Sequence, residues 1–273
     1  TPYPLPGFYK HLRMHRAVDW LSAQNEFSKQ DMHRMQLDRR SDRALAWKGW
    51  LADTADQLNE SDLAEQLRNW DGVMNANSEL AGLFAHWWQV LPQRLFDNGP
   101  LEDWRVGRTL LDDWLHTPSD GFELAAMDRD EAARLALLEV LDTGIRPLGD
   151  IQTLTINHPL AISGPLDAWL DLSRGPMPIG SGPGALNVTY HAWNESNQTL
   201  TARAGASMRY VMDWSNPDTF TLNLTLGQSG HPLSPHFADQ LDDFMNGTPW
   251  VVPFSRAAVE ELAVAQIRLV GRR

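Results

Sequence analysis

One short stretch combines residue types that could do hydrolytic chemistry. Ser229 stands in Gly227-Gln228-Ser229-Gly230, and a serine between glycines can act as a nucleophile when a sharp turn exposes its hydroxyl. The G-x-S-x-G turn of such enzymes places its second glycine one residue later than Gly230 does, and no plausible order of His and Asp completes a triad. The pattern therefore does not favour a Ser-His-Asp hydrolase.

A structural role suits the same stretch better. Gly227 and Gly230 permit a positive φ or a close approach of the backbone. Gln228 and Ser229 can form hydrogen bonds with neighbouring loops. We therefore predict a tightly packed loop here that need not touch substrate.

The residues that follow extend this structural interpretation. We predict that Ser234 caps a short helix with Pro235 at its first position, and that Asp239 lies early in that helix, where its charge suits the helix dipole. His231 and His236 flank the prolines, and we expect them to fix the loop through hydrogen bonds rather than to bind a metal. The segment is then expected to hold the last helix against a sheet.

A second pair of candidate ligands lies near the N-terminus. His11 and His15 are four residues apart, which can place two imidazoles on one helix face for zinc. Two histidines do not complete a site, and the neighbouring cations Lys10, Arg13 and Arg16 disfavour another cation. A basic, solvent-facing turn is the favoured interpretation.

Composition limits the classes of function. The 273 residues carry a formal net charge of -12, which disfavours nucleic acid and anionic membranes as partners. The chain has 12 tryptophans, which we expect mostly in the core or in pocket walls, and no cysteine, which excludes disulfides and thiolate chemistry. No apolar run reaches the ~20 residues that a membrane span needs, and no signal peptide is recognisable, so we expect any export signal upstream of Thr1.

The first half of the chain is predicted to be helical. Ser28 with Asp31 resembles a capping box, and Asp128 is expected to cap a helix that Gly144 ends. The other helices are predicted from apolar residues at helical spacing, at 32–51, 61–70 with Ser61 as cap, 78–91 and 103–115.

Residues beyond Leu148 change character. Ile151–Ile156 alternates with a period of two, as a half-buried strand does. Further strands are predicted at 185–193, 207–214, 220–226 and 262–270, and a helix at 234–244. Helices first and strands later indicate an α+β fold, with a mainly helical portion at 1–148 and a strand-rich portion at 149–273.

Six segments of the chain occur in the order of a known set of motifs: Arg13–Leu21, Gln36–Ser41, Trp70–Gly72, Gly149–Leu160, Ala204–Asp213 and Gly227–Gln240. The last is similar to the signature G-Q-S-G-x-P-x-S-P-H-[YF]-x-D-Q. Together they resemble the C-terminal part of the β subunit in the penicillin amidase (penicillin acylase) family, where Arg13–Leu21 matches a helix. Leu148 and Gln152 depart from the Trp and His that the family usually has there.

The resemblance implies an N-terminal-nucleophile hydrolase with antiparallel strands in a four-layer αββα core. In this family the first Ser of the β chain attacks an amide carbonyl, its own α-amine acts as the base, and an Asn side chain helps to stabilise the oxyanion. Both residues are expected outside this chain. Thr1 is not favoured as a nucleophile, because the resemblance places it well inside the β subunit. Arg13, which opens the family's helix, is the substrate-binding candidate, and the alternative is a surface arginine that is solvated or paired with a carboxylate.

The resemblance also implies a role and partners. We expect a scaffold and pocket part of an acylase that acts on a β-lactam side chain, an N-acyl homoserine lactone or a related acylated amine. Its partners would be the α and N-terminal β segments of one precursor, in the periplasm or secreted, with no cofactor, although calcium is possible in the parent enzyme. The alternatives are an inert homologue that only packs or binds, and an unrelated binding module.

Overall fold

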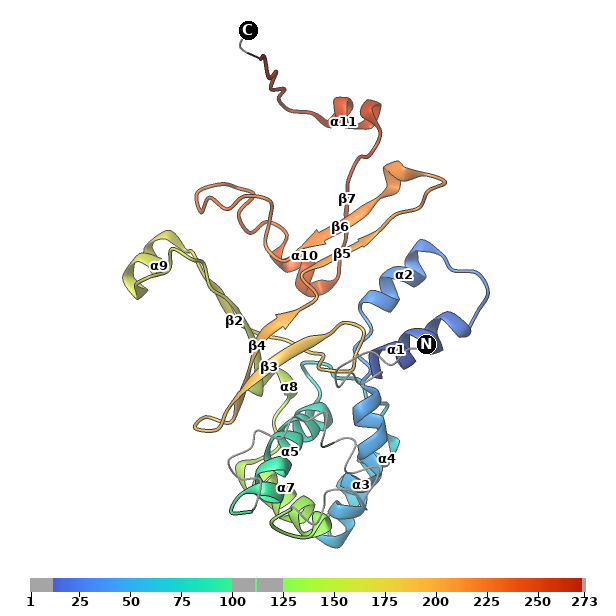
Figure 1. The fold of residues 1–273 in the computed structure, drawn as a ribbon, viewed down its shortest axis with the longest axis vertical. Coiled ribbons are helices and arrows are strands. Elements are labelled where there is room, and N and C mark those ends of the chain that lie inside the picture. The colour runs from blue at the N-terminus through green and yellow to red at the C-terminus, as the bar shows by residue number, and fades with distance from the viewer. Residues whose placement is uncertain (1–11, 100–110, 112–124, 272–273) are drawn as a thin grey trace.

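The computed structural model describes residues 12–99, 111 and 125–271 (Figure 1). The helices are α1 Leu12–Ser22, α2 Lys29–Gln36, α3 Asp42–Gln57, α4 Ser61–Asn69, α5 Glu79–Phe96, α7 Arg129–Thr143, α8 Leu148–Ile151, α9 Gly164–Leu170, α10 Leu241–Asn246 and α11 Arg256–Leu262, with a 3-10 turn at Pro217–Thr219. The strands are β1 Gln152–Ile156, β2 Arg174–Pro178, β3 Thr189–Asn194, β4 Thr199–Gly205, β5 Met208–Val211, β6 Thr221–Leu224 and β7 Trp250–Val251. Helices precede strands, so the predicted α+β class is confirmed.

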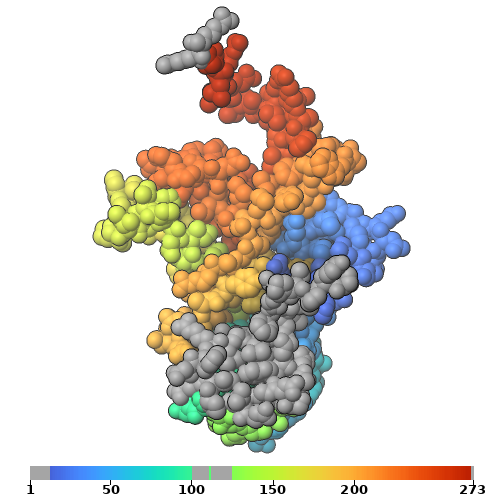
Figure 2. All heavy atoms as spheres, viewed as in Figure 1, coloured from blue at the N-terminus to red at the C-terminus, as the bar shows by residue number. Residues whose placement is uncertain are grey.

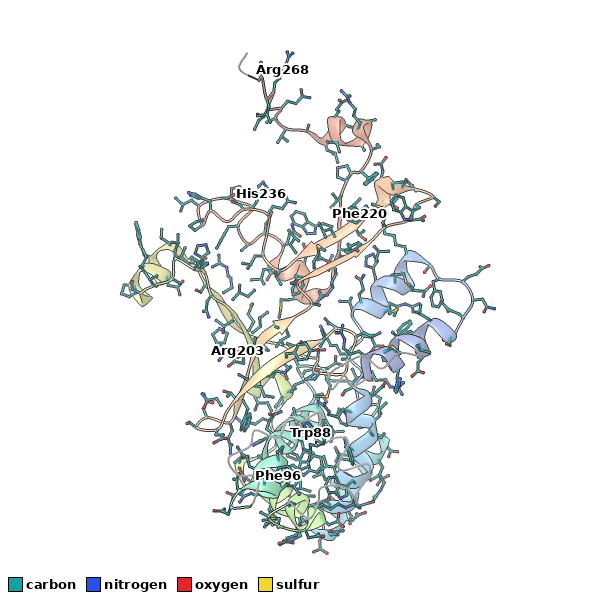
Figure 3. The ribbon with its side chains drawn as sticks, viewed as in Figure 1. Trp88, Phe96, Arg203, Phe220, His236 and Arg268 are labelled. Carbon is teal, nitrogen blue, oxygen red and sulfur yellow. The ribbon has the colours of Figure 1, made fainter. Side chains whose placement is uncertain are left out.

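The main core lies among α3, α4, α5 and α7, at the end of the molecule that Figure 1 draws lowest. Tryptophans fill much of it: Trp87 is fully buried and donates its indole N–H to the Ala133 carbonyl at 3.1 Å. Trp88, labelled in Figure 3, stacks on Trp47 with ring centroids 6.0 Å apart. Aromatic contacts of this kind bury a large apolar area, and they give the strand-rich part a rigid base.

Local capping signals explain where several helices begin. The capping box of Ser28 and Asp31 is present, and Asp128 accepts the N–H groups of the first turn of α7. Ser41 caps α3, so the apolar stretch predicted as one helix over 32–51 divides in two. The prediction for Ser61 was wrong: it is the first helical residue, and no side chain caps α4.

One predicted helix cannot be assessed along its length. The stretch 103–115 lies outside the described residues apart from Leu111, which is helical and buried. Elsewhere α5 continues through Pro92 as far as Phe96. None of the described helices is both long and apolar enough to cross a membrane.

The strands form two small sheets. The first has the order β2-β1-β4-β3, and the second has the order β5-β6-β7. All pairs are antiparallel except β1 with β4, which is parallel. A parallel pair requires a crossover, and the chain between β1 and β4 supplies it through α9, β2 and β3.

The strand predicted at 262–270 was also wrong. The chain after α11 has no regular structure and projects from the body of the molecule in Figures 1 and 2. Its alternating apolar side chains are open to solvent, with Ile267 90% and Leu269 92% exposed. A strand needs a neighbouring backbone for its hydrogen bonds, and none of the described residues pairs with this segment.

Candidate functional site

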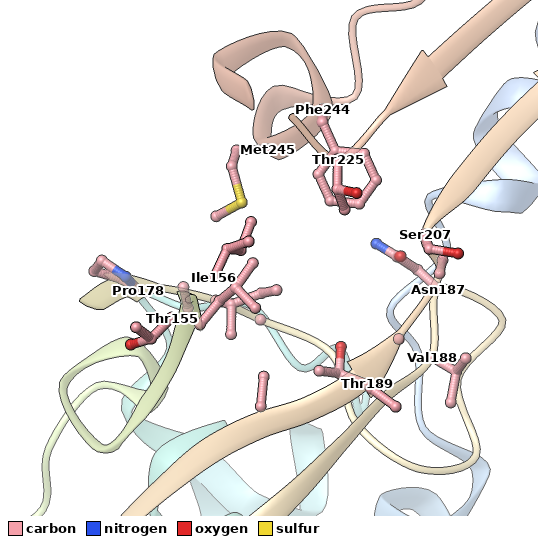
Figure 4. Close-up of a pocket in the computed structure, with 18 of the residues that line it drawn as sticks. Thr155, Ile156, Pro178, Asn187, Val188, Thr189, Ser207, Thr225, Phe244 and Met245 are labelled. Carbon is pink, nitrogen blue, oxygen red and sulfur yellow. The ribbon is translucent and has the colours of Figure 1, made fainter. Parts of the chain in front are cut away.

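A pocket of about 640 Å³ separates the first sheet from β5, β6 and α10. In Figure 4, Ile156 and Pro178 lie on one side of it, Asn187 and Ser207 lie on the other, and Phe244 lies above. The sheets hold these side chains because β4 leads directly into β5, so the two sheets diverge from one turn at 205–208. The result is a cavity with walls from both sheets.

Arg209 on β5 reaches this pocket and is held firmly. Its guanidinium donates to the Phe244 carbonyl at 2.7 Å and to the Asn187 side-chain oxygen at 3.1 Å. Its central carbon also lies 4.0 Å from the centre of the Phe244 ring. Burial, with a smaller contribution from the charge of Arg39, lowers the pKa of Arg209 to about 10. Arg209 is thus a desolvated cation whose hydrogen bonds go to neutral acceptors.

Arg39 lines the same pocket from the connection between α2 and α3. Its backbone carbonyl accepts from the Met74 N–H at 3.0 Å, and this bond fixes the connection against the helical core. Burial lowers the pKa of the Arg39 guanidinium. No hydrogen bond or ion pair joins this guanidinium to any residue of the described ranges. Two arginines therefore share one cavity.

The predicted substrate residue Arg13 lies near this region but not in it. It stands at the start of α1, is exposed, and donates to the Leu186 carbonyl at 3.5 Å. The helix is anchored one turn later, where Arg16 and Trp20 both donate to the carboxylate of Asp38, with Arg16 Nε at 2.8 Å. Arg13 is thus positioned by a half-buried ion pair, and its role in substrate binding stays a prediction.

The loop around Ser229 is close-packed on one side only. A Cβ on Gly227 would lie 2.6 Å from Asp239 Oδ1 and against the carbonyl of His236. Gly230 shows neither a positive φ nor any neighbour within 4 Å of such an atom, so the conformational reason predicted for it was wrong. The N–H of Ser229 donates to the His236 carbonyl at 3.0 Å, which closes the loop. Gln228 is exposed and lines a shallow pocket beside it.

The helix predicted at 234–244 is much shorter. It begins at Leu241, after Gln240, so neither Ser234 nor Pro235 starts it. Instead the hydroxyl of Ser234 accepts the N–H of His236 at 3.1 Å, a local turn that competes with helix formation. Gly247 ends α10 with a φ of 76°.

Asp239 precedes the helix and has another partner. One carboxylate oxygen bonds to His236 Nδ1 at 2.8 Å, and the other is buried with no hydrogen-bond partner. Ser229, His236 and Asp239 all line the shallow pocket. However, Ser229 Oγ accepts from the His231 N–H at 3.1 Å, and no hydrogen bond joins it to His236 in the part of the chain that the structure describes. The geometry therefore lacks the nucleophile–base contact of a triad.

Metal ligands do not gather anywhere in the described ranges. No group of three or more His, Asp or Glu side chains there could hold an ion. His15 is exposed, and His11 lies outside the described residues.

Sequence reasoning missed the arginines of the larger pocket. Arg39 and Arg209 both occur in segments that carried the family resemblance, Arg39 in Gln36–Ser41 and Arg209 in Ala204–Asp213. For Arg209, a charged residue inside a predicted strand was the available signal. Together the sheets, the helical base and the arginine-lined pocket define an α+β protein with a cavity between two sheets.

Comparisons with known proteins identify the family. The model of the penicillin amidase family matches residues 2–261, so this chain belongs to that family. The chain is 33% identical over 91 residues to acyl-homoserine lactone acylase QuiP of Pseudomonas aeruginosa, which covers 33% of this chain and 10% of that protein. It is 29% identical over 216 residues to penicillin acylase 2 proenzyme of Pseudomonas sp. strain SE83, which covers 71% of this chain and 26% of that protein. The chain thus spans only a fraction of the length of these relatives.

Proposed function

We propose that this chain is the C-terminal scaffold and pocket part of an amidohydrolase that cleaves acyl-amide bonds. The family match over residues 2–261 carries the proposal, together with relatives named as acylases. The substrate would be a small acylated amine, such as a β-lactam with an amide side chain or an N-acyl homoserine lactone. The nucleophile would be an N-terminal Ser in a segment outside these 273 residues.

The contacts of Ser229 support a nucleophile elsewhere. Its hydroxyl accepts a backbone N–H within its own loop, and its backbone closes that loop onto His236. A catalytic hydroxyl needs a base that accepts its proton. Ser229 therefore has the contacts of a loop-forming residue.

The projecting C-terminal segment supports the presence of partner segments. Apolar side chains such as Ile267 and Leu269 are almost fully exposed, which is costly for a chain in water. We infer that the remaining α and N-terminal β segments of the same precursor cover this segment, in a periplasmic or secreted enzyme. On this reading the portions 1–148 and 149–273 are parts of one larger enzyme.

Hydrolysis by the protein at its natural length tests the proposal. Release of the free amine from N-acyl homoserine lactones and from penicillins should occur with the processed protein and not with the isolated chain. Ser229→Ala should leave kcat within about twofold, because its hydroxyl makes only loop contacts. Loss of all turnover in a folded Ser229→Ala protein would place the nucleophile in this chain and overturn the proposal.

Arg13 allows a second test of the same proposal. Arg13→Gln should raise KM more than it lowers kcat, because a residue at the pocket mouth would bind the substrate and not the reacting atoms. Arg134→Gln, a matched loss of charge on the exposed face of α7, should change neither constant. No turnover by the full-length protein on any acylated amine would favour the alternative, an inert homologue that acts as a packing or binding module.

A further inference from the structure

The larger pocket has an unusual charge for this chain. The sequence holds 35 acidic and 23 basic residues, yet Arg39, Arg203 and Arg209 line the pocket and no Asp or Glu does. Figure 3 shows Arg203 on β4, and its side chain is exposed. In a protein with a net charge of -12, this local excess of positive charge needs a reason.

Folding alone gives no such reason for Arg209. Its Nε is buried without a partner, and its other nitrogens donate to uncharged oxygens. Buried charges in proteins are normally paired, because moving an ion out of water is costly. Among the described residues no ion pair joins this guanidinium to a carboxylate, and its contacts are two uncharged oxygens and the Phe244 ring.

Arg39 adds to that cost. It is close enough for its charge to lower the pKa of Arg209, and both side chains line the same cavity. Two like charges in one partly desolvated site repel each other unless an anion lies between or beside them. An arginine guanidinium with free N–H groups is also well suited to bind a planar oxyanion through two parallel hydrogen bonds.

Asn187 supplies a third donor, and its orientation is fixed. Its side-chain oxygen accepts from Arg209 Nη2, so its amide NH2 must face the other way. Figure 4 shows that this nitrogen points into the cavity. Its backbone is held at both ends, because its N–H donates to the Asp38 carbonyl at 2.9 Å and its carbonyl accepts from the Ser181 hydroxyl. The residue is 6% exposed and cannot easily turn its oxygen to the cavity.

The rest of the lining is largely apolar. Ile156 lies on one side, and Phe244 and Met245 reach the cavity from α10 (Figure 4). A volume of about 640 Å³ is in the usual range for small-molecule sites, ~300–1,000 Å³. A ligand that fits these walls has a charged end for the donors and an apolar body for the remainder.

We propose that this pocket binds a carboxylate with an apolar substituent. Arg39, Arg209 and the Asn187 amide would hold the two oxygens, and Ile156, Phe244 and Met245 would contact the substituent. The carboxylate could come from a free acid, such as the acyl acid that an acyl-amide hydrolase releases, or from an acidic side chain of another segment of the precursor. The choice of acyl acids as probes and the further precursor segments rest on the proposed function.

Binding of simple acids to the protein at its natural length tests the proposal. Isothermal titration with acetate, hexanoate and phenylacetate should show saturable binding that strengthens with apolar size, while hexanamide and phenylacetamide should not bind. Arg39→Gln should weaken the acids about ten- to hundredfold, the usual effect of losing a charged hydrogen bond. Arg268→Gln, which removes the same charge from the exposed C-terminal segment, should leave the affinity unchanged.

Asn187→Asp provides a second, nearly isosteric variant. It keeps the oxygen that accepts from Arg209 and replaces the donor with an anion inside the pocket, so binding of acids should be lost. Asn197→Asp in the exposed turn between β3 and β4 adds the same charge and should have no effect. Arg39→Gln and Asn187→Asp both leave Arg209 in place, so the test stays valid if Arg209 itself is required for folding.

The two sources of the carboxylate give different results. If an acidic side chain of another segment fills the pocket, added acids will not bind, and Arg39→Gln will weaken association of this chain with the remaining segments while Arg268→Gln will not. If acids do not bind and association is also unchanged, the proposal is wrong. Equal binding of acids to the wild type, Arg39→Gln and Asn187→Asp also overturns it. None of these readouts depends on hydrolysis, so failure of the proposed activity would be recognised separately.

Discussion

Replacing Gly227 with Ala should destabilise the protein, because the added methyl group would overlap atoms that already pack against Gly227. Gly227 lies under the loop that returns from His236 to Gln240, and the Gln240 N–H donates to the neighbouring Leu226 carbonyl at 2.7 Å. A Cβ at this position would lie 2.9 Å from the carbonyl carbon of His236 and 2.6 Å from Asp239 Oδ1, with the His236 carbonyl oxygen closer still. Two of these three atoms belong to the backbone, so the neighbour cannot move aside as a flexible side chain does.

The magnitude follows from these distances. Carbon atoms pack best at ~3.5–4.0 Å, so the approach of 2.9 Å to the carbonyl carbon is at least about 0.6 Å too short. Overpacking of one methyl group typically costs ~1–3 kcal/mol, and we expect the upper part of that range because backbone must shift. Gly230→Ala is the matched control: nothing lies within 4 Å of its Cβ, and the loss of a glycine stabilises by ~0.4–1 kcal/mol through the unfolded chain.

Urea denaturation of the two variants, followed by far-ultraviolet circular dichroism, measures the difference. Hydrogen exchange adds a local readout, because the Ser229 and Gln240 amides close this loop and should exchange faster in Gly227→Ala only. Equal free energies of unfolding for Gly227→Ala and Gly230→Ala, with unchanged protection of both amides, would refute the packing argument.

Two further predictions concern charged and titrating groups. Burial lowers the pKa of His191 to about 4, so the folded protein binds fewer protons than the unfolded chain between about pH 4 and 6.5, and stability should fall by up to about 3 kcal/mol as the pH decreases through that window. His191→Gln should flatten this dependence in thermal unfolding measured from pH 7 to pH 4, whereas His231→Gln, on an exposed loop, should not. Asp38→Asn should cost about 3 kcal/mol in urea denaturation, because it leaves the half-buried Arg16 without its counter-charge. The exposed ion pair of Asp53 with Arg68 gives the contrast, and Asp53→Asn should cost less than about 1 kcal/mol. Equal costs for Asp38→Asn and Asp53→Asn would contradict the burial argument.

Features with a local cause were predictable from the sequence. The capping box at Ser28 and the cap at Asp128 depend on residues within one turn of each other, and both occur as predicted. The helix predicted at 234–244 failed because Ser234 has two local options, and its hydroxyl bonds to the His236 N–H in a turn rather than capping a helix. A cap residue alone therefore does not fix where a helix begins.

Features that need a distant partner were not predictable. The period of two at 262–270 indicates which side chains share a face, but it says nothing about which backbone pairs with the strand. Arg39 and Arg209 come from segments far apart in the sequence, and only the packing of the α2–α3 connection beside β5 brings them to one cavity. Arg39 and Arg209 lie in segments that match family motifs, but neither received a role from the sequence.

The contrast between Arg16 and Arg209 separates charges that serve folding from charges that await a ligand. Arg16 is half-buried, and its guanidinium donates to a carboxylate of the same chain, so the energy of its desolvation is offset within the fold. Arg209 is desolvated enough to lower its pKa to about 10, yet its acceptors are a carbonyl and an amide. If Arg209 had only a structural role, an uncharged hydrogen-bond donor at this position would fill it without the cost of desolvating a charge. The position retains a cation beside a second cation, and an anion bound from outside the described residues is the simplest source of the missing stabilisation.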